Sequence, residues 1–167
     1  MALTANTLPS QVPFEVAPFD ANWALATQPT QTLTATGYMG APNQIDAGFG
    51  RIEGYWAIDI TAIDVVTGDE RYDFYLLASN DTGWANGNVE MCLMRSFGGA
   101  TGRPIATILG ASPAIPPFGA AGSLMILPWT NLQQRIVYRY LRGYVVISGT
   151  TPSVTFNSWL SMDCNSY

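Results

Sequence analysis

The sequence predicts an all-β fold, namely an eight-stranded jelly-roll-like β-sandwich that follows an extended N-terminal arm. Apolar and polar residues alternate with a period of two in several runs, which is typical of half-buried strands. Clusters of Gly, Pro, Asn and Asp separate these runs, and no window keeps the 3.6-residue period of a helix. A chain of 167 residues makes about one domain, and a jelly roll is a common way to close eight strands into a sandwich.

The arm is expected to span residues 1–29, and the β-sandwich domain residues 30–167. Prolines recur along the arm, so neither a helix nor a central strand can persist there. Phe14, Phe19 and Trp23 also belong to it, and a solvated tail has little use for three large aromatic side chains. These side chains either pack on the arm's own domain or dock on a neighbouring subunit, which makes them candidates for a protein interface.

The clearest strands form a predicted hairpin early in the domain. The run 54–66 places one set of apolar side chains on a single face: Trp56, Ile58, Ile60 and Ala62. The run 71–79 does the same with a second set: Tyr72, Phe74, Leu76 and Ala78. Thr67-Gly68-Asp69 lies between the two runs, and these residue types favour a tight turn.

Six further runs complete the expected strands, at residues 30–36, 89–95, 105–109, 123–127, 136–148 and 153–163. We expect Pro128 to end the run 123–127, because proline lacks the N–H of a ladder hydrogen bond. The final run alternates cleanly, and Val154, Phe156, Leu160 and Met162 are expected to share one face.

The composition favours a protein partner over nucleic acid or membrane. Hydrophobic residues make up 48% and charged residues 11% of the chain, against roughly 25% charged in an average domain, so much of the surface is uncharged. The net charge is -5, and the seven basic residues, all Arg, form no cluster, which argues against nucleic acid and anionic membranes. Arg without Lys either reflects protein interfaces, where guanidinium groups pair and stack, or is a compositional bias.

No localisation or redox motif stands out. No apolar stretch approaches the roughly 20 residues of a membrane helix, and the N-terminus shows no export signal, so we expect the chain to fold and act where it is made. Cys92 and Cys164 are too few to define a disulfide framework. We expect free thiols, with a bond between the two as the alternative.

The sequence offers no catalytic, metal-binding or cofactor-binding set, so we expect no enzyme activity. It contains no His, which removes the usual general base, the commonest metal ligand and every Ser–His or Cys–His nucleophile. Asp81-Thr82-Gly83 matches the active-site tripeptide of aspartic proteases, but it lies in a run of turn formers that explains it. Carboxylates also gather around the hairpin, where Asp59 and Asp73 are polar members of alternating strands and Asp69-Glu70 is expected to be a solvated turn.

The C-terminal third resembles the end of a known protein family. Residues 139–152 read Arg-Tyr-Leu-Arg-Gly-Tyr-Val-Val-Ile-Ser-Gly-Thr-Thr-Pro, and a strand with Trp159 and Leu160 follows up to Asp163. This arrangement is similar to that of tailed-phage capsid cement (decoration) proteins, with their Arg-Tyr-Leu-Arg strand, Ser-Gly turn and last strand ending in an apolar-acidic pair. Residues 73–81 resemble the family's strand that runs into a Ser-x-Asp turn.

The resemblance implies a jelly-roll fold and a structural role in a virion. Such proteins form homo-oligomers, here a dimer or a trimer, on the outside of the capsid and bind across junctions between subunits of the major capsid protein. A member would be made in the host cytoplasm and would end on the capsid exterior.

Arg139 and Arg142 lie in the strand that carries the resemblance, and they are further interface candidates. Their odd separation places them on opposite faces of that strand, so at most one meets solvent or a partner. The other would pack among aromatic rings or pair with a carboxylate, and a structural use of both is the alternative.

Two other functions remain as alternatives. One is a carbohydrate- or receptor-binding β-sandwich in which Trp84, Trp129 and Tyr38, placed in loops, would stack on sugar rings. The other is a coat protein that forms the shell itself.

Overall fold

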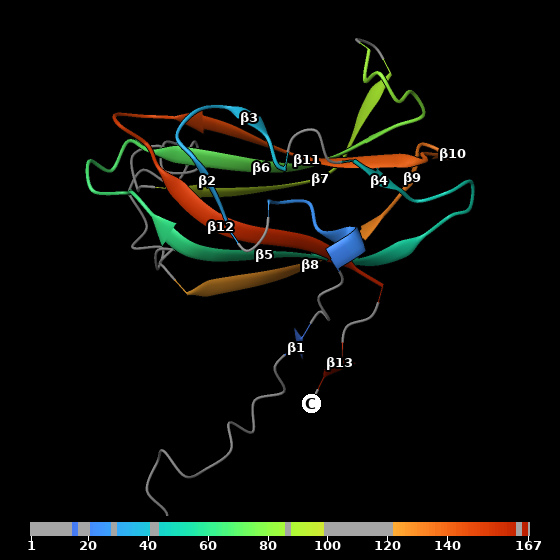
Figure 1. Cartoon of the computed structure of the whole chain (residues 1–167), viewed down its shortest axis with the longest axis horizontal. Coiled ribbons are helices and arrows are strands. Elements are labelled where there is room, and N and C mark those ends of the chain that lie inside the picture. Colours follow the sequence, from blue (N-terminus) through green and yellow to red (C-terminus); the bar gives the residue numbers. More distant parts are fainter. Residues whose placement is uncertain are drawn as a thin grey trace, which may run out of the picture.

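The fold is a sandwich of two antiparallel β-sheets, as the sequence predicts (Figure 1). The structure is a computed structural model, and it describes residues 15–16, 21–27, 30–40, 44–85, 88–98, 122–162 and 165–166. One sheet has the order β2-β12-β5-β8, from Gln31–Leu33, Val154–Ser161, Glu53–Ile63 and Ser123–Thr130. The other sheet is built around β11 (Tyr140–Ser148), which pairs with β3 (Gly37–Tyr38), β4 (Ile45–Asp46) and β6 (Arg71–Ser79). β6 pairs in turn with the edge strand β7 (Val89–Gly98).

The strand order is that of a jelly roll. When β3 and β4 count as one broken strand, the sandwich strands in chain order form one sheet with the order 1-8-3-6 and one with the order 2-7-4-5. The sequence predicts the class but not the composition of the eight, because β3 and β4 are two residues each and too short to show alternation. The predicted strand 105–109 lies outside the described residues.

The core lies between the two sheets and is rich in aromatic rings. In β6 the predicted inward set is confirmed, with no exposed surface on Tyr72, Phe74, Leu76 or Ala78. The Phe74 ring meets Phe97 of its own sheet edge-to-face at 5.1 Å and Phe156 of the opposite sheet at 4.9 Å, between ring centroids. Such pairs contribute about 0.5–1.5 kcal/mol beyond the area they bury, so Phe74 joins the two sheets.

A β-bulge in β5 overturns one predicted face. Ile60 pairs with Phe156 and Ala62 with Thr155, so Thr61 is an extra residue on β5. The bulge reverses the alternation: Ile63 packs against the core, and the prediction that Ala62 faces the core is wrong.

Several strand bounds differ from the sequence prediction, and three of the differences have a clear physical reason. β8 continues through Pro128 to Thr130, because β8 is an edge strand and a missing N–H on its outer side removes no ladder bond. The run 136–148 is two strands, since β10 (Ile136–Val137) pairs with β9 (Leu132–Gln133) before β11 begins. Met162 is exposed, not core-facing, because β12 ends at Ser161.

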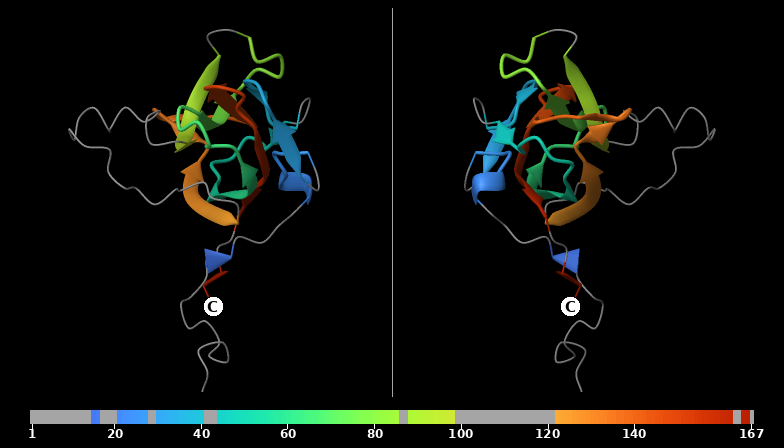
Figure 2. Two further views of the ribbon diagram at one scale, coloured as in Figure 1. Left: turned by 90° about the vertical axis from the view of Figure 1, so that its left-hand side faces the viewer. Right: turned by 90° about the vertical axis from the view of Figure 1, so that its right-hand side faces the viewer.

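Short elements complete the described part of the chain. The 3-10 helix η2 (Ala21–Trp23) leads into a segment whose Leu25 and Ala26 N–H groups donate to the Ser158 carbonyl oxygen of β12. The two-residue strands β1 (Glu15–Val16) and β13 (Asn165–Ser166) pair with each other beyond the sheet β2-β12-β5-β8 (Figure 2). No helix in the described ranges has the length and hydropathy to cross a membrane.

Candidate protein-binding surface

The outer face of the sheet that contains β11 carries aligned aromatic and sulfur-containing side chains. The register aligns Tyr38 with Tyr144, Tyr144 with Tyr75 and Tyr75 with Met94, so one row crosses β3, β11, β6 and β7. A second row aligns Arg142, Leu77 and Met91. Paired residues project to the same side of a sheet, and the next residues along β6 and β11 face the core. We call this set the tyrosine face: Tyr38, Tyr75, Leu77, Met91, Met94, Arg142 and Tyr144.

Contacts within the sheet hold the tyrosine face in place. Tyr38 and Tyr144 meet edge-to-face, with ring centroids 4.9 Å apart. The Arg142 guanidinium carbon lies 4.0 Å from the centroid of the Tyr38 ring and 5.6 Å from that of Trp84, within the range of cation–π attraction. Trp84 is fixed in turn, since its Nε1 donates to Gln44 Oε1 at 2.8 Å. Ordered side chains lose less conformational entropy when a partner binds.

The composition of the tyrosine face is typical of the centre of a protein interface. Tyr, Met and Arg are enriched in such centres, and Arg142 is the one charged member of the set. Met91 is 50% and Met94 43% exposed, so flexible thioether chains border the tyrosines. Methionine adapts to irregular partner surfaces, and a nearly uncharged surface has a low desolvation cost.

Of the two arginines singled out in the sequence, Arg142 lies on the tyrosine face and Arg139 pairs with a carboxylate. Arg139 Nε and Nη2 donate to Asp46 Oδ1 and Oδ2 at 2.7 and 2.6 Å. The hydrogen bond from Arg139 lowers the pKa of Asp46 to about 2. The Arg139 guanidinium carbon also lies 4.3 Å from the ring centroid of Phe49. Each arginine thus has one of the two environments that the sequence left open.

Of the arm aromatics, Trp23 packs on its own domain. It belongs to η2, is half-buried and contacts the hydrophobic core. Phe14 and Phe19 lie outside the described residues. The division of the chain at residue 30 stays a prediction, and within the predicted arm Leu25 and Ala26 are themselves buried.

The carboxylates near the first hairpin are structural, but two of them are not solvated. Glu70 is buried, which corrects the prediction of a solvated turn; it accepts hydrogen bonds from the Thr67 hydroxyl and from the N–H groups of Thr67 and Gly68, at 3.2 and 2.9 Å for the N–H groups. The Thr67 hydroxyl lowers the pKa of Glu70. Asp73 is buried beside Arg71, with Nε to Oδ2 at 2.9 Å. A carboxylate loses water when it is buried, and these donors replace it.

Asp81 of the Asp-Thr-Gly tripeptide is held in a turn. Its Oδ1 and Oδ2 accept hydrogen bonds from the N–H groups of Gly83 and Ala85 at 2.9 and 3.2 Å, and these bonds lower its pKa. Within the described ranges, no group of three or more His, Cys, Asp or Glu side chains could hold a metal ion. Turn geometry thus accounts for the tripeptide.

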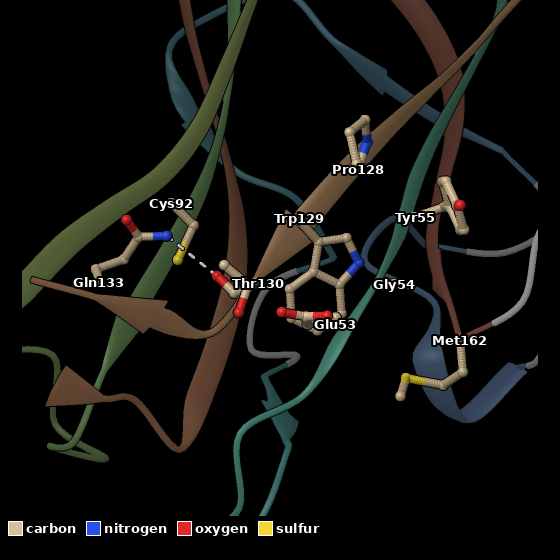
Figure 3. Close-up of a pocket in the computed structure, with 9 residues that line it drawn as sticks. All are labelled: Glu53, Gly54, Tyr55, Cys92, Pro128, Trp129, Thr130, Gln133 and Met162. Atoms are coloured by element: carbon tan, nitrogen blue, oxygen red, sulfur yellow. Dashed lines mark hydrogen bonds between the residues drawn. The ribbon is translucent and has the colours of Figure 1, made fainter. Parts of the chain in front are cut away.

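A hollow of about 510 Å³ lies between β5, β7 and β8 around Trp129 (Figure 3). Glu53 is the carboxylate in its wall, and it already pairs with Arg51. Trp129 Nε1 is buried and meets no hydrogen-bond acceptor among the residues that the structure describes. General acid–base catalysis by paired carboxylates needs a second acidic group, and among the described residues of this wall Glu53 is the one acidic side chain.

Cys92 lines the same hollow as a free thiol, and burial raises its pKa to about 11 from an ordinary value of 9.0. We therefore expect iodoacetamide at about pH 8 to alkylate Cys92 about a hundredfold more slowly in the folded chain than in the unfolded chain. The raised pKa favours the folded state below pH 9.0, and this contribution is lost as the pH rises through about 11. Peptide mapping after timed alkylation measures the rate, and equal rates in both states would contradict the burial.

The tryptophans considered for sugar stacking expose little of their surface. Trp84 and Trp129 are both buried, and Trp129 lies in β8 rather than in a loop. Tyr38 is in β3 and contacts Tyr144 and Arg142. Sugar rings stack on exposed faces of aromatic rings. Trp84, Trp129 and Tyr38 therefore do not form the sugar-stacking site that the sequence suggested.

In comparisons with protein-family models, curated proteins and solved structures, no match was found. The class that the residues themselves define is an antiparallel β-sandwich with jelly-roll strand order and a preformed tyrosine face on one sheet. Sequence reasoning found Arg142 but missed most of this face. The missing signal is the register across β3, β11, β6 and β7, which no local window of the sequence contains.

Proposed function

We propose that this chain is a structural virion protein that binds the outer surface of a phage capsid and stabilises it by bridging subunits of the major capsid protein. The single observation that carries the proposal is the tyrosine face, a nearly uncharged surface of ordered Tyr, Met and Arg side chains. This surface is the proposed contact with the shell. Its central strand, β11, is also the segment whose sequence resembles the capsid cement proteins.

The proposed mechanism is multivalent attachment. A face with few charges forms modest contacts through aromatic and sulfur-containing side chains, and each contact alone is weak. A homo-oligomer that engages several shell subunits at once gains avidity, because the second contact is formed at high effective concentration. Such bridging resists the separation of neighbouring shell subunits.

The test is binding to heads of the encoding phage that were assembled without this protein. We expect the wild-type chain to sediment with expanded heads and to raise the temperature at which they open. Replacement of both exposed methionines, Met91→Ser with Met94→Ser, is expected to weaken binding at least about tenfold, because two exposed apolar contacts of the tyrosine face are lost.

The matched control is Leu124→Ser. Leu124 is 48% exposed, similar to the two methionines, but it lies in β8 on the other sheet. We expect this variant to bind heads like the wild type. No sedimentation of the wild-type chain would contradict the capsid role, and equal binding of the methionine and Leu124 variants would contradict the tyrosine face as the contact.

A further inference from the structure

An exposed aromatic side chain stands at one end of the sandwich in a fixed position. Phe49 is 84% exposed, in the loop that follows β4. Arg139 lies over its ring at 4.3 Å, and Asp46 holds Arg139 through two hydrogen bonds. Asp46 Oδ1 also accepts from the N–H of Gly48 at 2.9 Å, which fixes the loop itself. We call Phe49 with this support the Phe49 knob; exposed aromatic rings held this way are typical anchors of protein interfaces.

A hollow of about 410 Å³ lies at the same end of the molecule, beside the start of β7. Val89, Ile136 and Tyr138 give it apolar walls, and Asp81 and Glu90 give it two carboxylates. Val89 and Ile136 are among the exposed large hydrophobic residues. We call it the β7–β10 hollow; it offers an apolar ring a partly desolvated site with a negative rim.

Hydrogen bonds join the knob and the hollow into one rigid unit. Asn80, in the wall of the hollow, accepts from the Arg139 N–H at 2.9 Å and donates to the Val137 carbonyl oxygen at 3.0 Å. Asn131 Nδ2 donates to the carbonyl oxygens of Gly50, beside the knob, and Tyr138, in the hollow, at 2.9 and 2.8 Å. The position of the knob relative to the hollow is therefore fixed.

The knob and the hollow belong to different strands of one sheet. β4, which leads to the knob, pairs with β11 at one edge, and β7, whose first residues line the hollow, is the strand at the other edge. Two different patches that fit each other form head-to-tail contacts between copies, and such contacts close into a ring when the rotation allows.

We propose that the Phe49 knob of one copy of this chain inserts into the β7–β10 hollow of a second copy, and that this contact builds the homo-oligomer. Charge supports a second copy as the occupant. The edge of a phenyl ring is electropositive, and the hollow that would receive it carries two carboxylates, Asp81 and Glu90. The inference deepens the proposed function, because multivalent attachment rests on an oligomer.

The first test is the mass of the chain in solution, without any shell. We expect the wild-type chain to have the mass of a dimer or larger ring in sedimentation equilibrium. Phe49→Ser is expected to have the mass of a single chain, because the knob is gone. The control is Val66→Ser: Val66 is 91% exposed but follows β5, in the connection to β6, and its replacement should leave the mass of the oligomer unchanged.

A mixing experiment tests the pairing of knob with hollow. Val89→Trp fills the hollow and leaves the knob intact, and this variant alone is expected to be monomeric. Mixed with Phe49→Ser, which keeps its hollow, it should form a one-to-one heterodimer through the single remaining contact. A monomeric wild type, an oligomeric Phe49→Ser chain or a mixture that stays monomeric would each overturn the inference.

The two proposals can fail separately. A variant that keeps the oligomer but no longer binds heads would locate its defect in the contact with the shell, and the contact between copies would be unaffected. A Phe49→Ser chain with unchanged mass but weaker head binding would assign Phe49 to the shell contact and overturn the contact between copies.

Discussion

Replacement of Asn131 by alanine is expected to lower the free energy of unfolding by about 3 kcal/mol. Asn131 is fully buried between β8 and β9. Its Oδ1 accepts from the Ile52 N–H at 2.7 Å, and its Nδ2 donates to the carbonyl oxygens of Gly50 and Tyr138. Alanine leaves all three backbone groups without this partner, and each unsatisfied buried group costs about 1–3 kcal/mol before relaxation. Urea denaturation followed by tryptophan fluorescence measures the change.

The control for Asn131 is Asn88→Ala, which removes the same atoms at an exposed turn position. The Asn88 side chain hydrogen-bonds to Asp81 at the surface, so we expect the free energy of unfolding of this variant to fall by at most about 1 kcal/mol, well below the loss at Asn131. Similar losses in the two variants would show that the buried hydrogen bonds of Asn131 do not carry the stability assigned to them. A selective loss at Asn131 would also predict a weaker oligomer, because this side chain holds both Gly50 and Tyr138.

Gly98→Ala is expected to have an effect of similar size, about 3 kcal/mol, through strain rather than lost bonds. Gly98 ends β7 with a φ of 141°, which side chains rarely adopt. A Cβ there would lie 2.3 Å from the Glu70 carbonyl oxygen and 3.0 Å from Arg71 Cα. These are backbone atoms, and Glu70 is itself buried and hydrogen-bonded, so the neighbouring segment cannot move away easily.

The matched control is Gly48→Ala. Gly48 has a positive φ of 75°, but a Cβ there would meet nothing within 4 Å. We expect only the conformational cost of about 1–2 kcal/mol. The difference between the two variants, measured as midpoints of denaturation at equal m-values, reports the contact with Glu70 together with the less accessible φ of Gly98. Equal losses would argue against that contact.

The sequence predicts well which side chains share a face of one strand, because that follows from alternation. It predicts poorly the features that depend on how two strands pair. The inward set of β6 follows from period two alone, because β6 has no extra residue of its own; the irregularity in its ladder with β7 lies at Cys92 of β7. The predicted position of Ala62 is wrong because the bulge at Thr61 is a property of the pairing between β5 and β12. The prediction that Pro128 ends its strand is wrong because an edge position is a property of the sheet, not of the residue.

The candidate surface shows the same division. The odd separation of Arg139 and Arg142 predicts opposite faces of one strand, but Arg139 precedes β11, and the partners of both arginines are distant in sequence. Asp46 lies 93 residues from Arg139, and Tyr38 reaches Arg142 only because β3 pairs with β11. Trp84 is a further example, because Gln44 and Arg142 fix its ring from two other segments. Tertiary pairing therefore decides which aromatic rings are presented and which are buried.

The pairing of β1 with β13 has a practical consequence for engineering. These strands bring the segments near both chain ends together, beyond the sheet β2-β12-β5-β8 and on the side away from the tyrosine face (Figure 2). A fluorescent protein or an antigen fused before Glu15 or after Ser166 would therefore leave the molecule on this side. If the tyrosine face lies on the shell, such cargo would be displayed toward the surrounding medium, and one particle could carry two different fusions side by side.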